Sequence, residues 1–132
     1  MGPPGDFADL RHLLSGYDDL RLAILFGSLA TGRAGPESDL DLAVRFDRPL
    51  TAERKQALIE RLAEATGRPV DLVDLHTVGE PFLGQILQKG VRLAGSDNEY
   101  GNLLARHLFD EADFMPYYRR ILETRRKAWT GE

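Results

Sequence analysis

The sequence contains no cysteine and no long run of apolar residues. Without cysteine, the protein cannot form disulfides, bind metals through thiolates or use a cysteine nucleophile. Its longest apolar runs, such as residues 22–26, are far shorter than a membrane-spanning helix requires. The first residues, Met-Gly-Pro-Pro-Gly, lack the basic and apolar segments of a secretory signal, so we expect a cytoplasmic protein that does not contact a membrane.

Basic residues are also in the minority. The chain has 17 Lys plus Arg against 21 Asp plus Glu, which gives a formal net charge of -4. A general nucleic-acid-binding protein usually has a basic excess, so we expect no stable direct binding to nucleic acid. Residues 117–132 carry a net positive charge, whereas the rest of the chain is net negative. The basic segment is either a docking element or a helix end whose cations interact favourably with the helix dipole.

The hydrophobic pattern predicts one domain of short strands and helices. The length of 132 residues fits a single domain over residues 1–132, with a core at about 6–95 and a C-terminal helical segment at about 98–129. Strands are expected at residues 20–26, 39–46, 70–75 and 91–94, and helices from residue 6, at 51–66, at 82–88 and from about 98 to 129, where Pro116 should kink or divide the last one. This alternation indicates an α/β or α+β domain.

A Gly-Ser pair follows the first expected strand. Gly27 and Ser28 should open a helical turn, which presents free backbone N–H groups to an anion. The glycine lets an anion approach closely, and the serine adds a hydroxyl donor. Taken alone, such a pair is more often a simple turn.

Two carboxylates lie on one face of the second expected strand. Asp39 and Asp41 are two residues apart, and alternate residues of a strand point to the same side. Carboxylates that close repel each other, so one takes up a proton unless a cation lies between them. Mg²⁺ accepts such oxygens and bridges them to phosphate. The alternative is an amphipathic strand with a solvated acidic face.

The third expected strand brings further carboxylates into an apolar segment. Asp71 and Asp74 lie on opposite faces of residues 70–75. A carboxylate among core-type residues is unfavourable unless it is paired or metal-bound. Asp71 lies near the strand start and is the preferred third member of a two-metal site, provided that this strand lies beside residues 39–46. Asp74 is the fallback, although a strand-end or turn role suits it better.

These residues together resemble a known family. Gly27-Ser28, ten residues, then Asp39-x-Asp41, with Asp71 in a later strand, is similar to the DNA polymerase β-type nucleotidyltransferase superfamily. The short chain and its Ser38-Asp39-Leu-Asp41-Leu segment resemble the minimal members, the MntA-like antitoxins encoded beside HEPN-domain toxins. The resemblance covers about residues 20–95. It implies an α+β fold, with a small mixed β-sheet flanked by helices and a long C-terminal helix.

The resemblance also implies a reaction and roles for residues. Gly27 and Ser28 would grip the β- and γ-phosphates of ATP, with Arg33 and Ser38 as further nucleotide-binding residues. The catalytic carboxylates Asp39, Asp41 and Asp71 would ligate two Mg²⁺ ions. AMP would pass to a tyrosine of a HEPN ribonuclease toxin, and pyrophosphate would leave.

One position departs from the family pattern. Many relatives have Arg directly before the second motif glycine, whereas here Thr31 precedes Gly32 and Arg33 follows it. If that Arg helps to hold the triphosphate, Arg33 must replace it.

Two other functions remain alternatives. The first is an antitoxin of weak or no activity that neutralises its toxin by binding alone, and retention of the motif residues argues against it. The second is a small-molecule nucleotidyltransferase, which is disfavoured because only about 37 residues follow Gly95 and leave little room for an acceptor domain. A zinc site is not expected, because the three histidines are scattered without metal-ligand spacing.

Overall fold

A mixed four-stranded sheet organises the protein. The structure, a computed structural model, describes residues 7–35 and 37–110. The strands are β1 (Leu20–Phe26), β2 (Leu40–Phe46), β3 (Val70–Asp74) and β4 (Val91–Gly95), in the order β3-β2-β1-β4. β1 pairs antiparallel with β2 and with β4, while β2 and β3 are parallel. The small mixed sheet that the sequence predicted is therefore confirmed.

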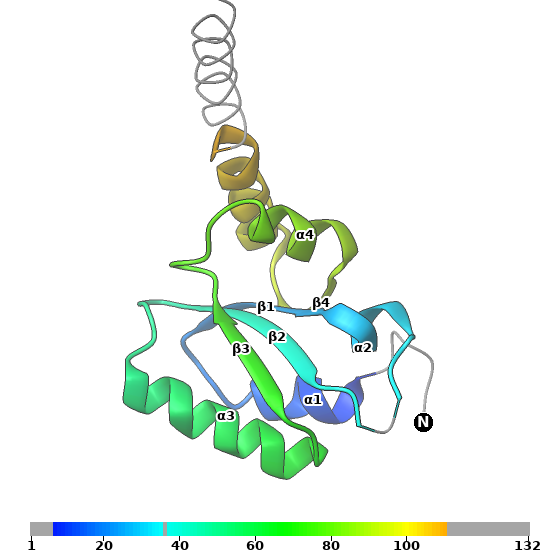
Figure 1. Ribbon diagram of the computed structural model, residues 1–132. Coiled ribbons are helices and arrows are strands. Elements are labelled where there is room, and N and C mark those ends of the chain that lie inside the picture. Colours follow the sequence, from blue (N-terminus) through cyan, green and yellow to red (C-terminus); the bar gives the residue numbers. More distant parts are fainter. Residues whose placement is uncertain (1–6, 36, 111–132) are drawn as a thin grey trace, which may run out of the picture.

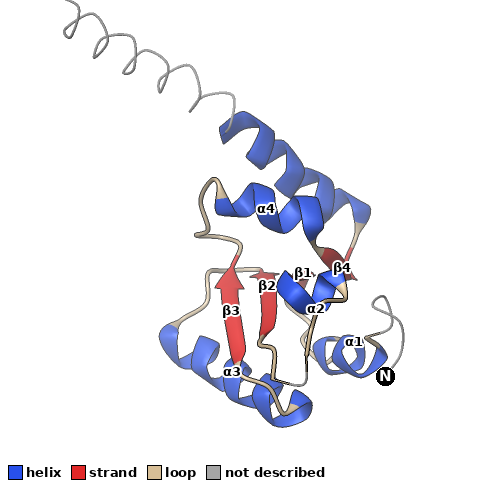
Figure 2. Ribbon diagram, turned by 45° about the vertical axis from the view of Figure 1, so that its right-hand side comes forward, coloured by secondary structure: helices blue, strands red, loops and turns tan. Residues whose placement is uncertain are grey.

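Helices cover both faces of this sheet (Figure 1 and Figure 2). The helices α1 (Ala8–Leu14) and α3 (Ala52–Thr66) lie on one face, and α4 (Phe82–Lys89) lies on the other, beside the helix of residues 97–110. The short helix α2 (Gly27–Thr31) directly follows β1. Among the described residues, no helix combines the length and the apolar character needed to cross a membrane.

The element boundaries agree with the sequence pattern to within one or two residues. Thr51 caps α3 rather than beginning it, because its hydroxyl accepts a hydrogen bond from the N–H of Arg54 at 3.1 Å. The same helix ends at Gly67, whose φ of 68° is left-handed. The expected continuation of the last helix to residue 129, its division at Pro116 and the basic segment 117–132 lie outside the described residues.

Each face of the sheet has its own apolar cluster. Toward α1 and α3, the alternate residues of β2 are almost completely buried together with residues of the two helices. Toward α4, residues of β1 pack against that helix and against Leu103. The second cluster consists of Leu22, Ile24, Phe26, Ala43, Leu75, Leu83, Ile86, Leu87 and Leu103. Strand periodicity thus builds a core on both sides of the sheet.

Polar contacts fix the last described helix beside α4. The guanidinium of Arg106 donates to the backbone carbonyls of Leu75, at 2.7 Å, and Val78. His107 pairs with Glu80, in the loop that leads into α4. These contacts tie the helix of residues 97–110 to the segment that joins β3 to α4.

Candidate active site

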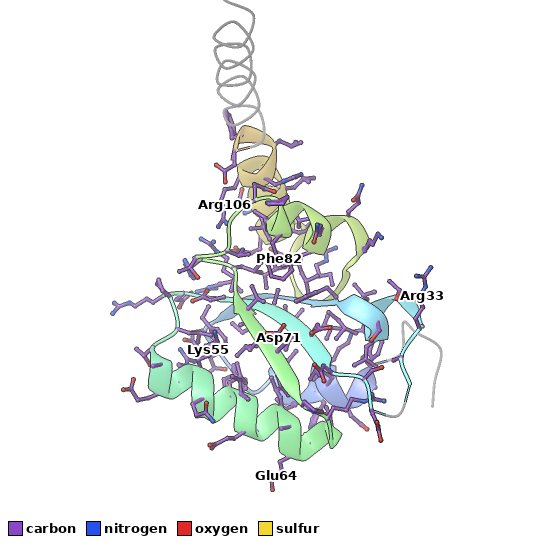
Figure 3. The ribbon with its side chains drawn as sticks, in the orientation of Figure 1. Arg33, Lys55, Glu64, Asp71, Phe82 and Arg106 are labelled. Atoms are coloured by element: carbon purple, nitrogen blue, oxygen red, sulfur yellow. The ribbon has the colours of Figure 1, made fainter. Side chains whose placement is uncertain are left out.

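One row of residues crosses three strands on the face that carries α4. In the sheet register, Phe26 of β1 lies opposite Asp41 of β2, and Asp41 lies opposite Asp71 of β3. Neighbouring strands lie about 4.8 Å apart and residues in register point to the same face, so the two carboxylates are neighbours. Asp39 lies directly before β2, which begins at Leu40 rather than at residue 39 as expected, and its charge acts on Asp41. Asp71 is labelled on β3 in Figure 3.

The surroundings of Asp41 disfavour its ionised form. Burial raises the pKa of Asp41 above its usual value of 3.8, and the negative charges of Asp71 and Asp39 raise it further. The charges of both Asp71 and Asp39 therefore act on the Asp41 carboxyl. The fold thus brings Asp41 beside Asp71, with Asp39 two residues away along the chain, and the role of the three as one catalytic set stays a prediction.

Asp74 is occupied elsewhere. One oxygen of its carboxylate accepts a hydrogen bond from the N–H of Leu50 at 2.8 Å, and the other accepts from the N–H of His76 at 2.9 Å. These bonds hold the segment before α3 and the turn after β3. The structure thus brings Asp71 beside Asp41 and gives Asp74 the strand-end and turn contacts that the sequence favoured.

The backbone of Gly27 touches the carboxylate of Asp41. Gly27 has a left-handed φ of 71°, and a Cβ built on it would lie 2.1 Å from Oδ2 of Asp41. A side chain here would be strained and would displace the carboxylate, so glycine is required. The predicted helical turn after β1 is confirmed as α2, and its Thr31 hydroxyl donates to the Ser28 carbonyl at 3.3 Å.

Ser38 and Arg33 have contacts within the loop between α2 and β2. The Ser38 hydroxyl accepts from the N–H of Gly35 at 2.9 Å, and its carbonyl accepts from the guanidinium of Arg68, also at 2.9 Å. The backbone N–H of Arg33 donates to the Ser28 carbonyl at 3.0 Å, while its exposed side chain projects outward from the loop in Figure 3. Arg68, which braces this loop ahead of Asp39, has no motif that would reveal it in the sequence.

A groove of about 530 Å³ opens beside Gly27, between α2 and α4. Its lining consists of Phe26, Gly27, Thr31, Phe82, Gln85, Ile86, Gln88 and Lys89. Sequence reasoning treated residues 82–88 only as a helix and missed this wall. The available signal was the spacing of Phe82, Gln85 and Lys89, which places them on one side of a helix. The packing of α2 beside α4 is visible only in the fold.

The three carboxylates match a hard divalent cation by their chemistry. They offer only oxygen ligands, which Mg²⁺ prefers, and their mutual repulsion is the condition that a cation relieves. Within residues 7–35 and 37–110, no three His, Asp or Glu side chains already converge closely enough to hold a metal ion. The cluster therefore supplies a suitable donor set without a finished coordination shell.

Comparison with known proteins assigns the fold to a family. Residues 8–99 match the family described as "Polymerase beta, Nucleotidyltransferase". The chain belongs to this family. The residues that match include the whole sheet and the three carboxylates Asp39, Asp41 and Asp71, called the acidic row below. Membership in the polymerase beta nucleotidyltransferase family confirms the resemblance that the motif spacing indicated.

Within the polymerase beta nucleotidyltransferase family, one similar relative is the protein adenylyltransferase MntA of Shewanella oneidensis. It is 34% identical over 80 residues, which cover 61% of this chain and 58% of the relative. The chain thus spans less than two thirds of the length of this curated relative.

Solved structures share the polymerase beta nucleotidyltransferase fold. A crystal structure of a toxin-antitoxin with AMP-PNP has a TM-score of 0.76 at 24% identity, covering 89% of this chain and 98% of that chain. A structure of a tri-AMPylated Shewanella oneidensis HEPN toxin in complex with MNT antitoxin has a TM-score of 0.69 at 23% identity. The match covers 87% of this chain and 90% of that chain. At these identities the likeness concerns the fold, and the predicted α+β class is confirmed.

Proposed function

We propose that the protein is a metal-dependent nucleotidyltransferase that transfers AMP from ATP to a partner protein. The observation that carries this proposal is the row in which Gly27 touches Asp41 and Asp41 lies opposite Asp71. This row places a glycine, whose backbone a phosphate can approach closely, directly beside a set of carboxylates. The name of the Shewanella relative supports adenylyl transfer.

The reaction is an in-line displacement at the α-phosphorus of ATP. The acceptor hydroxyl oxygen forms a bond to the α-phosphorus, the bond from phosphorus to the β-phosphate oxygen breaks, and pyrophosphate leaves with the electron pair. Asp71 accepts the hydroxyl proton, while Gly27 and the Ser28 hydroxyl bind the departing phosphates. Asp39, Asp41 and Asp71 would hold Mg²⁺. When bound, the ion would neutralise negative charge on the phosphates.

The roles of Arg33 and Ser38 are secondary in this proposal. The Ser38 hydroxyl already accepts from Gly35, so it acts by shaping the loop before Asp39. Arg33 follows α2 and is exposed, so its guanidinium is free to meet phosphate only from the outer side of the loop.

We further propose a tyrosine of a HEPN ribonuclease toxin as the acceptor. The similar structures are described as toxin-antitoxin complexes, and one contains an AMPylated HEPN toxin. The last described helix also exposes apolar side chains: Leu104 is 38% exposed, Leu108 56% and Phe109 71%. Adjacent exposed apolar residues suit a protein partner. Use of ATP keeps the cytoplasm as the expected location.

Neutralisation by binding alone is the second candidate. The exposed apolar side of the helix of residues 97–110 favours it, because that surface can bind a toxin without any carboxylate chemistry. Its weakness is the acidic row, which a pure binding protein does not need.

An isotope experiment tests the proposal. The protein is incubated with Mg²⁺, its cognate HEPN toxin and ATP labelled at either the α- or the γ-phosphate. Adenylyl transfer predicts toxin labelled only from α-labelled ATP, with pyrophosphate released. Label from γ-labelled ATP would contradict adenylyl transfer. An unlabelled toxin whose ribonuclease activity is still inhibited would favour the binding alternative.

A further inference from the structure

The wall that α4 contributes to the groove carries a single charged side chain, and it is a cation. Lys89, the last residue of α4, lines the groove with Gln85 and Gln88, and Gly27 and Thr31 of α2 line it as well. None of the ion pairs among the described residues includes Lys89. The positive charge of Lys89 therefore stands in the groove without a carboxylate partner in the described part of the chain.

The remainder of the lining suits an organic ligand. The rings of Phe26 and Phe82 meet edge to face, with centroids 5.5 Å apart, and Phe82 stays 39% exposed. Phe82, Gln85 and Lys89 follow one another at helical spacing along α4, so aromatic, amide and cationic groups face the groove in turn. Small-molecule pockets of about 300–1,000 Å³ are usually apolar with a few placed polar groups, and this groove of about 530 Å³ fits that description.

Gly27 belongs both to the groove and to the acidic row. On one side it touches the carboxylate of Asp41, and on the other it lines the groove. A polyphosphate bound at Gly27 has carboxylates, which repel it, on the first side. On the second side the groove that Gly27 lines also presents Lys89, and a lysine ammonium binds phosphate as a point charge.

We propose that the groove between α2 and α4 binds the donor nucleotide and that Lys89 positions its polyphosphate by contacting the phosphates that leave. The inference rests on the proposed function for the identity of the ligand, a nucleoside triphosphate. It adds a binding residue outside the acidic row and assigns the α4 wall to the donor rather than to the acceptor.

Two lysine substitutions test this inference. Lys89→Gln removes the charge in the groove, and Lys55→Gln removes the same charge from α3, on the opposite side of the sheet, where Lys55 is exposed. Binding of ATP and of AMP to the full chain is measured by calorimetry with Mg²⁺. Loss of a charged hydrogen bond should weaken ATP binding about tenfold or more in Lys89→Gln. AMP lacks the leaving phosphates, so its affinity should change little.

The controls separate a binding role from a structural one. Lys55→Gln should bind ATP like the wild type, Lys89→Arg should keep most of the affinity, and all variants should unfold at the same temperature. In the transfer assay, Lys89→Gln should raise KM for ATP more than it lowers kcat. Unchanged ATP binding in Lys89→Gln, or an equal loss for ATP and AMP, overturns the role of Lys89.

Failure of the underlying function gives a different result. If Lys89→Gln binds ATP normally and the wild type still labels its toxin, only the assignment of Lys89 is wrong. If the wild-type chain binds no ATP in the presence of Mg²⁺, both the groove assignment and the proposed adenylyl transfer are wrong.

Discussion

The seven residues of β2 alternate between two faces of the sheet, and the two faces serve different purposes. Toward α1 and α3 the strand presents only apolar side chains that are at most 1% exposed: Leu40, Leu42, Val44 and Phe46. Toward α4 it presents Asp41, Ala43 and Arg45, of which the two charged residues remain partly exposed. The comparison teaches that a closed apolar face can hold the strand in place while the other face keeps carboxylates that repel each other. Substitutions on the two faces should therefore fail in different ways.

The largest effect is expected on the closed face, from Leu42→Ala. Leu42 is completely buried in the cluster beneath α1 and α3, so its truncation leaves a cavity. The free energy of unfolding should fall by about 2–5 kcal/mol, measured by urea denaturation. A matched change on the open face, Asp41→Asn, should not lower it. If Leu42→Ala unfolded like the wild type, the division of labour between the faces would be wrong.

On the open face, Asp39→Asn and Asp41→Asn should each abolish AMP transfer and leave the fold intact. Each change removes a charge without changing the size of the side chain. Mutation of residues that only hydrogen-bond to metal ligands lowers metal affinity or activity by about 10–100-fold. Removal of a ligand itself should therefore lower the transfer rate by more than about 100-fold. Toxin labelling from α-labelled ATP measures the rate, and circular dichroism checks the fold. A wild-type rate in either variant would refute the assignment of these carboxylates.

Asp71 and Asp74 repeat the comparison within β3. Asp71→Asn should lose transfer, again by more than about 100-fold, with little change in unfolding. Asp74→Ala should keep the rate of the folded protein but lose about 1–3 kcal/mol of stability, because two backbone N–H groups lose their acceptor. Transfer rates and urea midpoints are measured side by side. The reverse pattern would make Asp74 the third catalytic carboxylate.

Local patterns predicted the elements and the carboxylates, since these depend on neighbours in the chain. The alternation in β2 and the ten-residue spacing from Ser28 to Asp39 were readable without a structure. The position of Asp71 was predictable only on the condition that β3 lies beside β2, because strand pairing joins residues 30 apart in sequence.

Long-range packing explains what the sequence could not show. The groove depends on the approach of α2 to α4, and the brace on the loop before Asp39 depends on Arg68, which contacts residues far from it in sequence. The extent of the domain, 1–132, stays a prediction, as do the roles of all the site residues, including Arg33 and Ser38.

The smallest expected effect is a pH dependence on the open face. Burial and the charges of Asp71 and Asp39 raise the pKa of Asp41 in the folded chain above 3.8, so the folded chain holds this proton more tightly than the unfolded chain. The resulting stabilisation is fully present below the unfolded-state pKa of 3.8, and it is lost as the pH rises through the higher folded-state pKa. Asparagine cannot ionise. The stability of Asp41→Asn relative to the wild type should therefore increase over this window in metal-free buffer.

The gain should stay below about 1 kcal/mol, because Asp41 is partly exposed and solvent screens the repulsion. Urea unfolding of both proteins from about pH 3 to about pH 7 measures it. Mg²⁺ should then reverse the order near neutral pH, since it relieves repulsion that only the wild type has. A difference that is independent of pH would mean that the carboxylates do not interact. An equal gain from Mg²⁺ in both proteins would place the cation away from Asp41, and the open face would then be acidic without being a metal site.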